Sequence, residues 1–282
     1  MDNTSSTVIQ NLARKLGIRP SNILGQNFLV DQDILNEIVL IADIKKGEHI
    51  LEIGPGFGVL TSELTKKGAN VLAVEQDKKL ADNLSKTGKA GKLTVIQKDI
   101  LKYTNKEISK YFSGEPYRIV ANIPYNITGK IIKKFVSAEL PKPTSALLLV
   151  QKEVGERICS EPGSMNLLAL SVQAYAEPRI AMEVPRIAFW PEPKVDSALL
   201  EISDINEKPK HGIQDEKRFW QLIHIGFASP RKQLQNNISN GLKIESSDSK
   251  KAIHSLGLSE TIRAQELGIS DWIGLISALG EN

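Results

Sequence analysis

The feature that most constrains this chain is a regular alternation of short apolar runs with longer amphipathic stretches, which starts near residue 49. The apolar runs have the length and the Val, Ile and Leu content of buried strands, and the stretches between them have helical spacing. Such alternation predicts a doubly wound, mostly parallel α/β sheet whose ligands bind at the carboxyl ends of the strands. The expected strands are 49–53, 70–75, 93–99, 118–123 and 145–151, and the expected helices are 31–42, 59–67, 78–85 and 128–138.

The pattern changes after this alternation. Runs 179–184 and 195–202 are strand-like and are joined by a proline-rich connection, which predicts an antiparallel hairpin on the edge of the sheet. The polar composition of residues 203–214 predicts a linker. We therefore expect a catalytic domain over 1–205 and a small all-helical C-terminal domain over 206–282. The helices expected in the second domain are 215–227, 231–238, 247–256 and 271–279.

Composition limits the classes of protein that this chain can represent. No apolar run approaches the roughly 20 residues of a membrane span, and the N-terminus has no basic patch followed by an apolar stretch. The single cysteine, Cys159, excludes an intramolecular disulfide and a multi-cysteine metal site. The net charge of +3 permits a nucleic-acid partner without requiring one. We expect a cytoplasmic protein with no membrane partner and no metal.

A glycine-rich turn follows the first expected strand. Residues 51–58 read LEIGPGFG, and glycines such as Gly54 and Gly56 let a ligand approach the backbone closely. The segment does not match a dinucleotide-binding fingerprint, because Val59 stands where that motif has its third glycine. It does not match a P-loop either, because no Gly-Lys-Ser/Thr follows. A glycine turn alone can also be purely structural.

Two acidic residues strengthen the interpretation of this turn as a ligand site. Glu75 ends the second strand, where a carboxylate can accept hydrogen bonds from both hydroxyls of a ribose. Asp99 ends the third strand, where it can accept from the exocyclic amine of an adenine. Together with the glycine turn they describe a nucleoside-containing ligand across the edge of the sheet. The pattern resembles class I methyltransferases, which implies S-adenosylmethionine (S-adenosyl-L-methionine) as the cofactor.

The fourth strand ends in Asn122-Ile123-Pro124-Tyr125. Such a tetrapeptide can be a simple proline turn, but at this place it resembles the motif of methyltransferases that act on planar amines. An adenine amine is a poor nucleophile because its lone pair is delocalised into the ring. The Asn122 side-chain oxygen and the Ile123 carbonyl can each accept an N–H and turn the lone pair toward the methyl group. Tyr125 offers a face for an unstacked base.

The set of motifs resembles the bacterial small-subunit ribosomal RNA adenine dimethyltransferases over about residues 25–240. This resemblance implies that Asn27 and Leu29 help to close over the cofactor, and that Phe189 stacks on the target adenine opposite Tyr125. From sequence alone, the pair Phe189-Trp190 would sooner belong to the core. The matching segments are 25–29, 51–61, 122–127, 151–154 and the Phe189, Pro193–Ala198 stretch.

The resemblance also implies a substrate. The family places two methyl groups on each of two adjacent adenines near the 3′ end of small-subunit rRNA, within an immature 30S ribosomal subunit. We expect a monomeric enzyme whose binding rests on RNA shape and phosphates as much as on RNA sequence. The chain departs from the family at 230–236, which loses two cationic positions, and at 167–169. Both departures concern RNA docking rather than the reaction.

Four alternatives remain at this point. A large-subunit rRNA adenine methyltransferase of the antibiotic-resistance type shares the Asn-Ile-Pro-Tyr-Asn-Ile segment, but Gly54–Gly58 and Pro193–Ala198 favour the small-subunit family. A DNA adenine methyltransferase more often shows Asp-Pro-Pro-Tyr. The protein could also act chiefly as a ribosome-assembly binding factor. A nicotinamide oxidoreductase is disfavoured by the glycine spacing.

Overall fold

The computed structural model describes residues 4–21, 25–87 and 92–280 and divides the chain into two compact units. The first unit comprises Met1–Gly155 and Glu177–Glu207, and the second comprises Glu156–Ala176 and Lys208–Asn282. The second boundary lies close to the predicted division after residue 205. Residues 156–176, however, group with the helical unit, because backbone hydrogen bonds tie them to it, such as Met165 N to Gln265 O at 2.9 Å and Lys210 N to Ala174 O at 2.7 Å.

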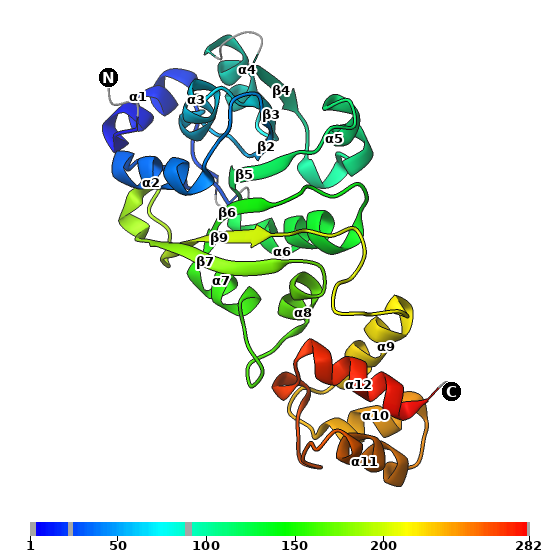
Figure 1. The fold of residues 1–282 in the computed structure, drawn as a ribbon. Helices are drawn as coiled ribbons and strands as arrows, with labels where there is room; N and C mark the ends of the chain where they lie inside the picture. Colours follow the sequence, from blue (N-terminus) through cyan, green and yellow to red (C-terminus); the bar gives the residue numbers. More distant parts are fainter. Residues whose placement is uncertain (1–3, 22–24, 88–91, 281–282) are drawn as a thin grey trace. The chain divides into compact units, whose positions relative to one another are not determined.

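A seven-stranded sheet forms the centre of the first unit, in the order β4-β3-β2-β5-β6-β9-β7 (Figure 1). The first five strands in this order are parallel, and β9 and β7 are antiparallel to their neighbours. The doubly wound sheet and its antiparallel edge hairpin are thus confirmed. The strands are β2 (His49–Ile53), β3 (Asn70–Glu75), β4 (Leu93–Gln97), β5 (Arg118–Asn122), β6 (Ala146–Gln151), β7 (Glu177–Val184) and β9 (Ser197–Ser203).

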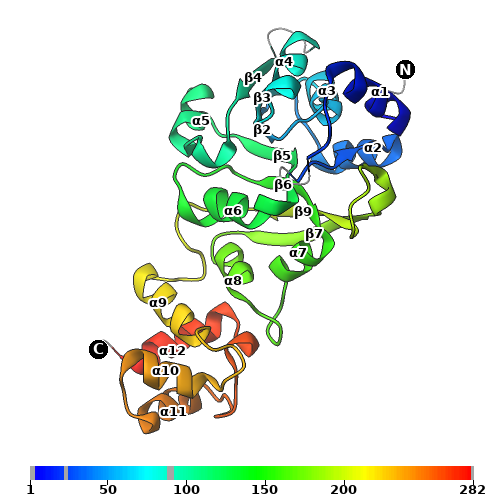
Figure 2. The ribbon, with the colours of Figure 1, turned by 180° about the vertical axis from the view of Figure 1, so that it is seen from behind.

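Helices cover both faces of this sheet. α2 (Gln32–Ala42) and α3 (Val59–Lys66) contribute Leu35, Ile38 and Leu64 to a core that also holds alternate residues of the strands. α6 (Thr128–Ile132) lies over the opposite face in the view from behind (Figure 2) and continues as a π-helix over Lys133–Ala138. Because both faces are covered, β2, β3 and β6 are buried almost throughout, and this explains their largely apolar sequences.

The N-terminal part of the unit forms a second, smaller core. α1 (Ser6–Leu16) packs Ile9 and Ala13 into a small core with Phe28, Phe57 and Leu80. The Asp31 carboxylate caps α2 by accepting from Asp33 N and Ile34 N. The remaining helices of the unit, α4 (Lys78–Thr87), α5 (Asn105–Tyr111) and the start of α7 (Lys152–Ile158), connect successive strands.

A second, two-stranded sheet joins distant parts of the first unit. β1 (Phe28–Leu29) pairs antiparallel with β8 (Phe189–Trp190), so that Phe28 lies opposite Trp190 and Leu29 opposite Phe189. The ladder continues in the hydrogen bond from Val30 N to Ala188 O, 2.8 Å long. This pairing fixes the segment before α2 next to the connection between β7 and β9.

The second unit is helical. It contains α8 (Leu167–Gln173), α9 (Glu216–Gly226), α10 (Leu234–Leu242), α11 (Ser246–Ser255) and α12 (Ile269–Leu279). The four predicted C-terminal helices are therefore present, although α10 begins at Leu234 rather than at residue 231. The fully buried Trp272 packs against Gly226, where a Cβ would come within 2.3 Å of the indole ring. No described helix is long and apolar enough to cross a membrane.

Candidate active site

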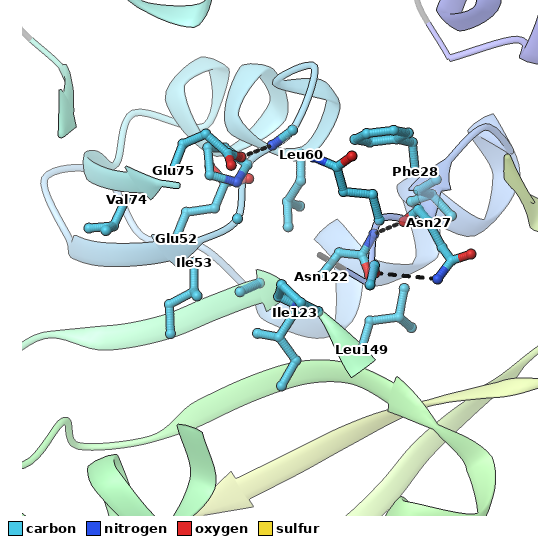
Figure 3. Close-up of a pocket in the computed structure, with 18 of the residues that line it drawn as sticks. Asn27, Phe28, Glu52, Ile53, Leu60, Val74, Glu75, Asn122, Ile123 and Leu149 are labelled. Atoms are coloured by element: carbon cyan, nitrogen blue, oxygen red, sulfur yellow. Dashed lines mark hydrogen bonds between the residues drawn. The ribbon is translucent and has the colours of Figure 1, made fainter. Parts of the chain in front are cut away.

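A pocket opens at the carboxyl ends of β2, β3 and β5 and is walled by the segment before α2 (Figure 3). Most of the predicted cofactor residues line it, namely Asn27, Leu29, Gly54, Gly56, Glu75 and Asn122. Apolar side chains such as Ile53, Leu60 and Leu149 form much of the rest. Ligands of doubly wound sheets bind at this edge, so the pocket lies where the topology predicts a site.

The glycine turn is shaped for close approach. Gly54, Gly56 and Gly58 have φ angles of 66°, 59° and 80°, which L side chains rarely adopt. A Cβ on Gly56 would also lie 2.9 Å from the Phe28 ring. The turn therefore requires glycine at position 56 for two independent reasons, and its residues Gly54–Phe57 line the pocket just before α3 begins.

Glu75 is buried against this turn. Its Oε2 accepts a hydrogen bond from Gly56 N at 3.1 Å, and its Oε1 accepts from Asp77 N at 2.9 Å. Burial raises the pKa of the Glu75 carboxyl above its usual range, and the backbone N–H donors partly oppose this shift. Each carboxylate oxygen has a further lone pair, so both can still accept from hydroxyl groups of a ligand.

Asp99, unlike Glu75, does not line the pocket. Its Oδ1 accepts from Leu101 N at 2.9 Å and caps the short 3₁₀ helix Ile100–Lys102. The pocket is lined by its chain neighbours Lys98 and Ile100 but not by Asp99 itself. The carboxylate is half-buried beside the pocket rather than in its wall.

Glu52 is a site residue that the sequence analysis did not single out. It is 1% exposed, it lines the pocket, and its Oε2 has no hydrogen-bond partner among the described residues. Burial raises the pKa of its carboxyl to about 8, Thr61 opposes the shift, and the nearby Glu75 adds to it. A glutamate within the otherwise apolar β2 was the signal in the sequence, because an unpaired buried carboxyl is costly.

The carboxyl end of β5 places its last residue, Asn122, in the pocket wall. Its Nδ2 donates to the backbone carbonyl of Asn27 at 3.0 Å (Figure 3). None of the described residues donates a hydrogen bond to its Oδ1. The amide thus presents an acceptor that remains available to a ligand.

The other two predicted catalytic residues lie beside the pocket. The Tyr125 hydroxyl shares a 2.6 Å hydrogen bond with Ser197 Oγ, and burial raises the pKa of the Tyr125 phenol to about 12. Phe189 is 3% exposed and belongs to the core that contains Val184 and Leu199. Its ring meets the Tyr125 ring edge to face, with centroids 6.5 Å apart. A base could lie between the two rings only after they separate.

No described residues form a group of three or more His, Cys, Asp or Glu side chains that could hold a metal ion. The parallel sheet, the glycine turn, the buried carboxylates and the Asn-Ile-Pro-Tyr loop together define the class of methyltransferases that act on planar amines. Solved structures share this fold. The 23S rRNA methyltransferase ErmE matches with a TM-score of 0.72 at 24% identity, over 90% of this chain and all of ErmE.

A dimethyladenosine transferase from Plasmodium falciparum matches with a TM-score of 0.69 at 24% identity, over 88% of this chain and 95% of its own. The model of the ribosomal RNA adenine dimethylase family matches residues 19–279. The chain belongs to this family. The predicted ribosomal RNA adenine dimethyltransferase is thereby confirmed.

Curated relatives agree with this assignment. The chain is 38% identical to ribosomal RNA small subunit methyltransferase A of Dehalococcoides mccartyi, over 94% of this chain and 90% of the relative. Proteins with the same name from Alkaliphilus oremlandii and Bacillus cereus are 37% and 36% identical, each over 96% of this chain and over 96% and 94% of their own lengths. The fold is shared with ErmE, so these relatives, and not the fold, favour the small-subunit enzymes over the large-subunit alternative.

Proposed function

We propose that this chain transfers methyl groups from S-adenosylmethionine to the N6 amines of two adjacent adenines near the 3′ end of small-subunit rRNA. The observation that carries the proposal is the Asn122 amide, which holds an available acceptor oxygen in the wall of the pocket at the edge of the sheet. The names of the curated relatives support the small-subunit substrate.

The pocket fits the cofactor in its polar groups. Glu75 has lone pairs available for ribose hydroxyls, and Gly54 and Gly56 leave the backbone open to the neighbouring part of the ligand. The unpartnered Oε2 of Glu52 suits an ammonium group, and the α-amino group of the cofactor is such a group. Asp99 lies two residues after the end of β4, beside the pocket, and would accept from the adenine amine there. Asn27 and Leu29 close the pocket from the segment before α2.

The bound cofactor would supply a methyl group on a positively charged sulfur. The protein orients the nucleophile: Asn122 Oδ1 and the Ile123 carbonyl accept the two N–H groups of the target amine, so that its lone pair faces the methyl group. No general base is needed before transfer, because the ammonium product is strongly acidic. The high pKa of the Tyr125 phenol keeps it neutral near pH 7, so it does not serve as a base.

Tyr125 offers its ring as the stacking face for the adenine. The Phe189 ring supports the Tyr125 ring through an edge-to-face contact. When the two rings move apart, Phe189 would contact the adenine from the side opposite Tyr125. Catalysis thus belongs to the first unit of the chain. The helical second unit is proposed to dock on the immature 30S subunit, with the enzyme acting as a cytoplasmic monomer.

The test is to map modified adenines after incubating the purified protein with labelled S-adenosylmethionine and unmethylated ribosomal subunits. We expect label on two adjacent adenines near the 3′ end of small-subunit rRNA when small subunits are supplied. Label confined to large subunits would replace the proposal with the antibiotic-resistance type of activity. Absence of label in both, with the cofactor bound, would argue for a binding factor instead.

A further inference from the structure

We propose that the backbone carbonyl of Asn27 selects asparagine over aspartate at position 122 and fixes which atom of the Asn122 amide faces the substrate. This inference rests on the proposed function, because it concerns how the acceptor for the target amine is oriented. The two residues lie 95 positions apart and meet through the hydrogen bond from Asn122 Nδ2 to Asn27 O, 3.0 Å long.

The Asn27 carbonyl is held in place from several sides. The Asn27 side chain donates to Gly25 O at 3.4 Å, and Gln26 accepts from Ser21 N at 2.9 Å through its side-chain oxygen. The next two residues are fixed by the pairing of β1 with β8. Gly25 itself packs against the loop after β5, since a Cβ there would lie 2.8 Å from Asn126 Oδ1. The carbonyl is therefore a fixed acceptor rather than an adaptable one.

A fixed acceptor allows only one orientation of the Asn122 amide. If the amide were flipped, its oxygen would face the Asn27 oxygen at hydrogen-bond distance with no proton between them, which is unfavourable. With Nδ2 toward Asn27, the Oδ1 atom is available in the pocket wall, where an amine donor can be met. The N-terminal segment is thus a positioning element for the reaction as well as a wall of the pocket.

The same geometry distinguishes asparagine from aspartate. An ionised aspartate has two acceptor oxygens and no donor, so one of them would oppose the Asn27 carbonyl. A protonated aspartate restores the wild-type pattern, because its O–H can donate to Asn27 O while the other oxygen accepts from the substrate. Only the protonated fraction of an Asn122→Asp enzyme should therefore be correctly arranged, and above the pKa of the carboxyl that fraction grows about tenfold for each unit by which the pH falls.

The experiment measures single-turnover methylation by Asn122→Asp and by wild type between about pH 8 and about pH 6, with saturating cofactor. We expect the ratio of variant to wild-type rate to rise at least about tenfold as the pH falls. Glu52, Glu75 and Lys98 are the ionisable residues that line the pocket, and all three are present in both proteins, so their own titration largely divides out of the ratio. A ratio that stays flat, at a high or a low level, overturns the inference.

Two control variants separate the possible causes. Asn122→Ala lacks both the donor and the acceptor, so its ratio should stay flat. Asn36→Asp adds the same charge at an exposed position on α2 outside the pocket, where the carboxylate can still accept from Gln32, and its ratio should stay flat as well. If Asn122→Ala methylates at the wild-type rate, the proposed function fails. If it is inactive while Asn122→Asp is active at every pH, only the inference about Asn27 fails.

A measurement on the wild-type protein does not depend on the folding of any variant. In a ¹⁵N-labelled sample, one side-chain amide proton of Asn122 should show the small temperature dependence and slow solvent exchange of a hydrogen-bonded proton, without cofactor or RNA. Two equivalent, rapidly exchanging protons would show that the bond to Asn27 is absent, and the inference would be wrong.

Discussion

Glu75 Oε2 accepts a hydrogen bond from the backbone N–H of Gly56, 3.1 Å away, so the carboxylate expected to bind the cofactor also holds the glycine turn in shape. Two elements of the pocket, one after β2 and one at the end of β3, are therefore connected before any ligand arrives. Loss of this carboxylate removes both a ligand contact and a support of the turn.

The first prediction concerns Glu75. Glu75→Ala should weaken cofactor binding about tenfold to a hundredfold, in line with about 1.5–3 kcal/mol for hydrogen bonds to a charged group. Glu75→Gln should lose less, since its amide oxygen can still accept from Gly56 N. Titration calorimetry with S-adenosylmethionine gives both values. Unchanged affinity in Glu75→Ala would contradict the assignment.

The second prediction concerns stability and pH. Burial raises the pKa of Glu52 from 4.5 to about 8, so between these values the folded protein holds a proton that the unfolded chain releases. Stability of the ligand-free protein should therefore fall as the pH rises from about 4.5 to about 8 and then level off. The contribution is on the order of a few kcal/mol.

Glu52→Gln provides the matched comparison, because it keeps the shape and removes the titration. Denaturant unfolding at several pH values should show the variant gaining stability relative to wild type as the pH rises. A constant difference between the two proteins would mean that Glu52 is not protonated in the folded state.

The third prediction links the same carboxyl to the cofactor. An ammonium group beside Glu52 favours the carboxylate, so binding of S-adenosylmethionine near pH 7 should release most of one proton. The affinity should accordingly rise with pH and level off above about pH 8, where the free carboxyl is already ionised. Calorimetry in buffers with different ionisation enthalpies measures the release. Glu52→Gln should show none, and an equal release in both proteins would assign the proton to another group.

The fourth prediction concerns Asn122. Asn122→Ala should lower the methylation rate by about a hundredfold to a thousandfold, the range seen when one preorganised polar contact to a transition state is lost. Cofactor affinity should change much less. Near-normal methylation of small subunits by this variant, with the cofactor bound, would remove the loop after β5 from the mechanism.

The fifth prediction concerns Phe189, which is buried in the core as well as adjacent to Tyr125. Phe189→Ala should cost about 3–5 kcal/mol of stability because of the cavity that it leaves. Phe189→Leu should stay folded and reduce turnover, with cofactor affinity intact, since the Tyr125 ring loses its edge contact. Full turnover in Phe189→Leu would limit this residue to a structural role.

The parallel strands of the large sheet could be predicted to within two residues, because a strand covered on both faces must be largely apolar. The short strands β1 and β8 were not predicted. β2 and β3 match the expected ranges fully, and β4 ends two residues early, where the chain turns toward Asp99. The first residue of α10 was harder to predict, because Arg231 and Lys232 are as compatible with a helix as with the turn that they form. Local propensity does not separate the two.

Site residues could be predicted where a motif gives the reason for the residue type, as for Gly54, Glu75 and Asn122. Contacts between distant segments could not. Nothing in the spacing indicates that Asn122 meets the Asn27 carbonyl, because this contact depends on the pairing of β1 with β8. The burial of Phe189 agrees with the expectation that aromatic pairs belong to the core, and its contact with the base stays a prediction. Glu52 could be recognised in the sequence as a carboxylate in a largely apolar strand. Its place in the pocket wall could be seen only in the structure.

The pairing of Phe28 and Leu29 with Phe189 and Trp190 also has a consequence for biosynthesis. The glycine turn, Glu75 and Asn122 all leave the translating ribosome before residue 189 has been synthesised. The wall that contains Asn27 cannot take its final position until then. A growing chain thus carries every residue of the reaction loop well before it can enclose a ligand, and the capacity to methylate arises only when the last strands of the catalytic unit have been made.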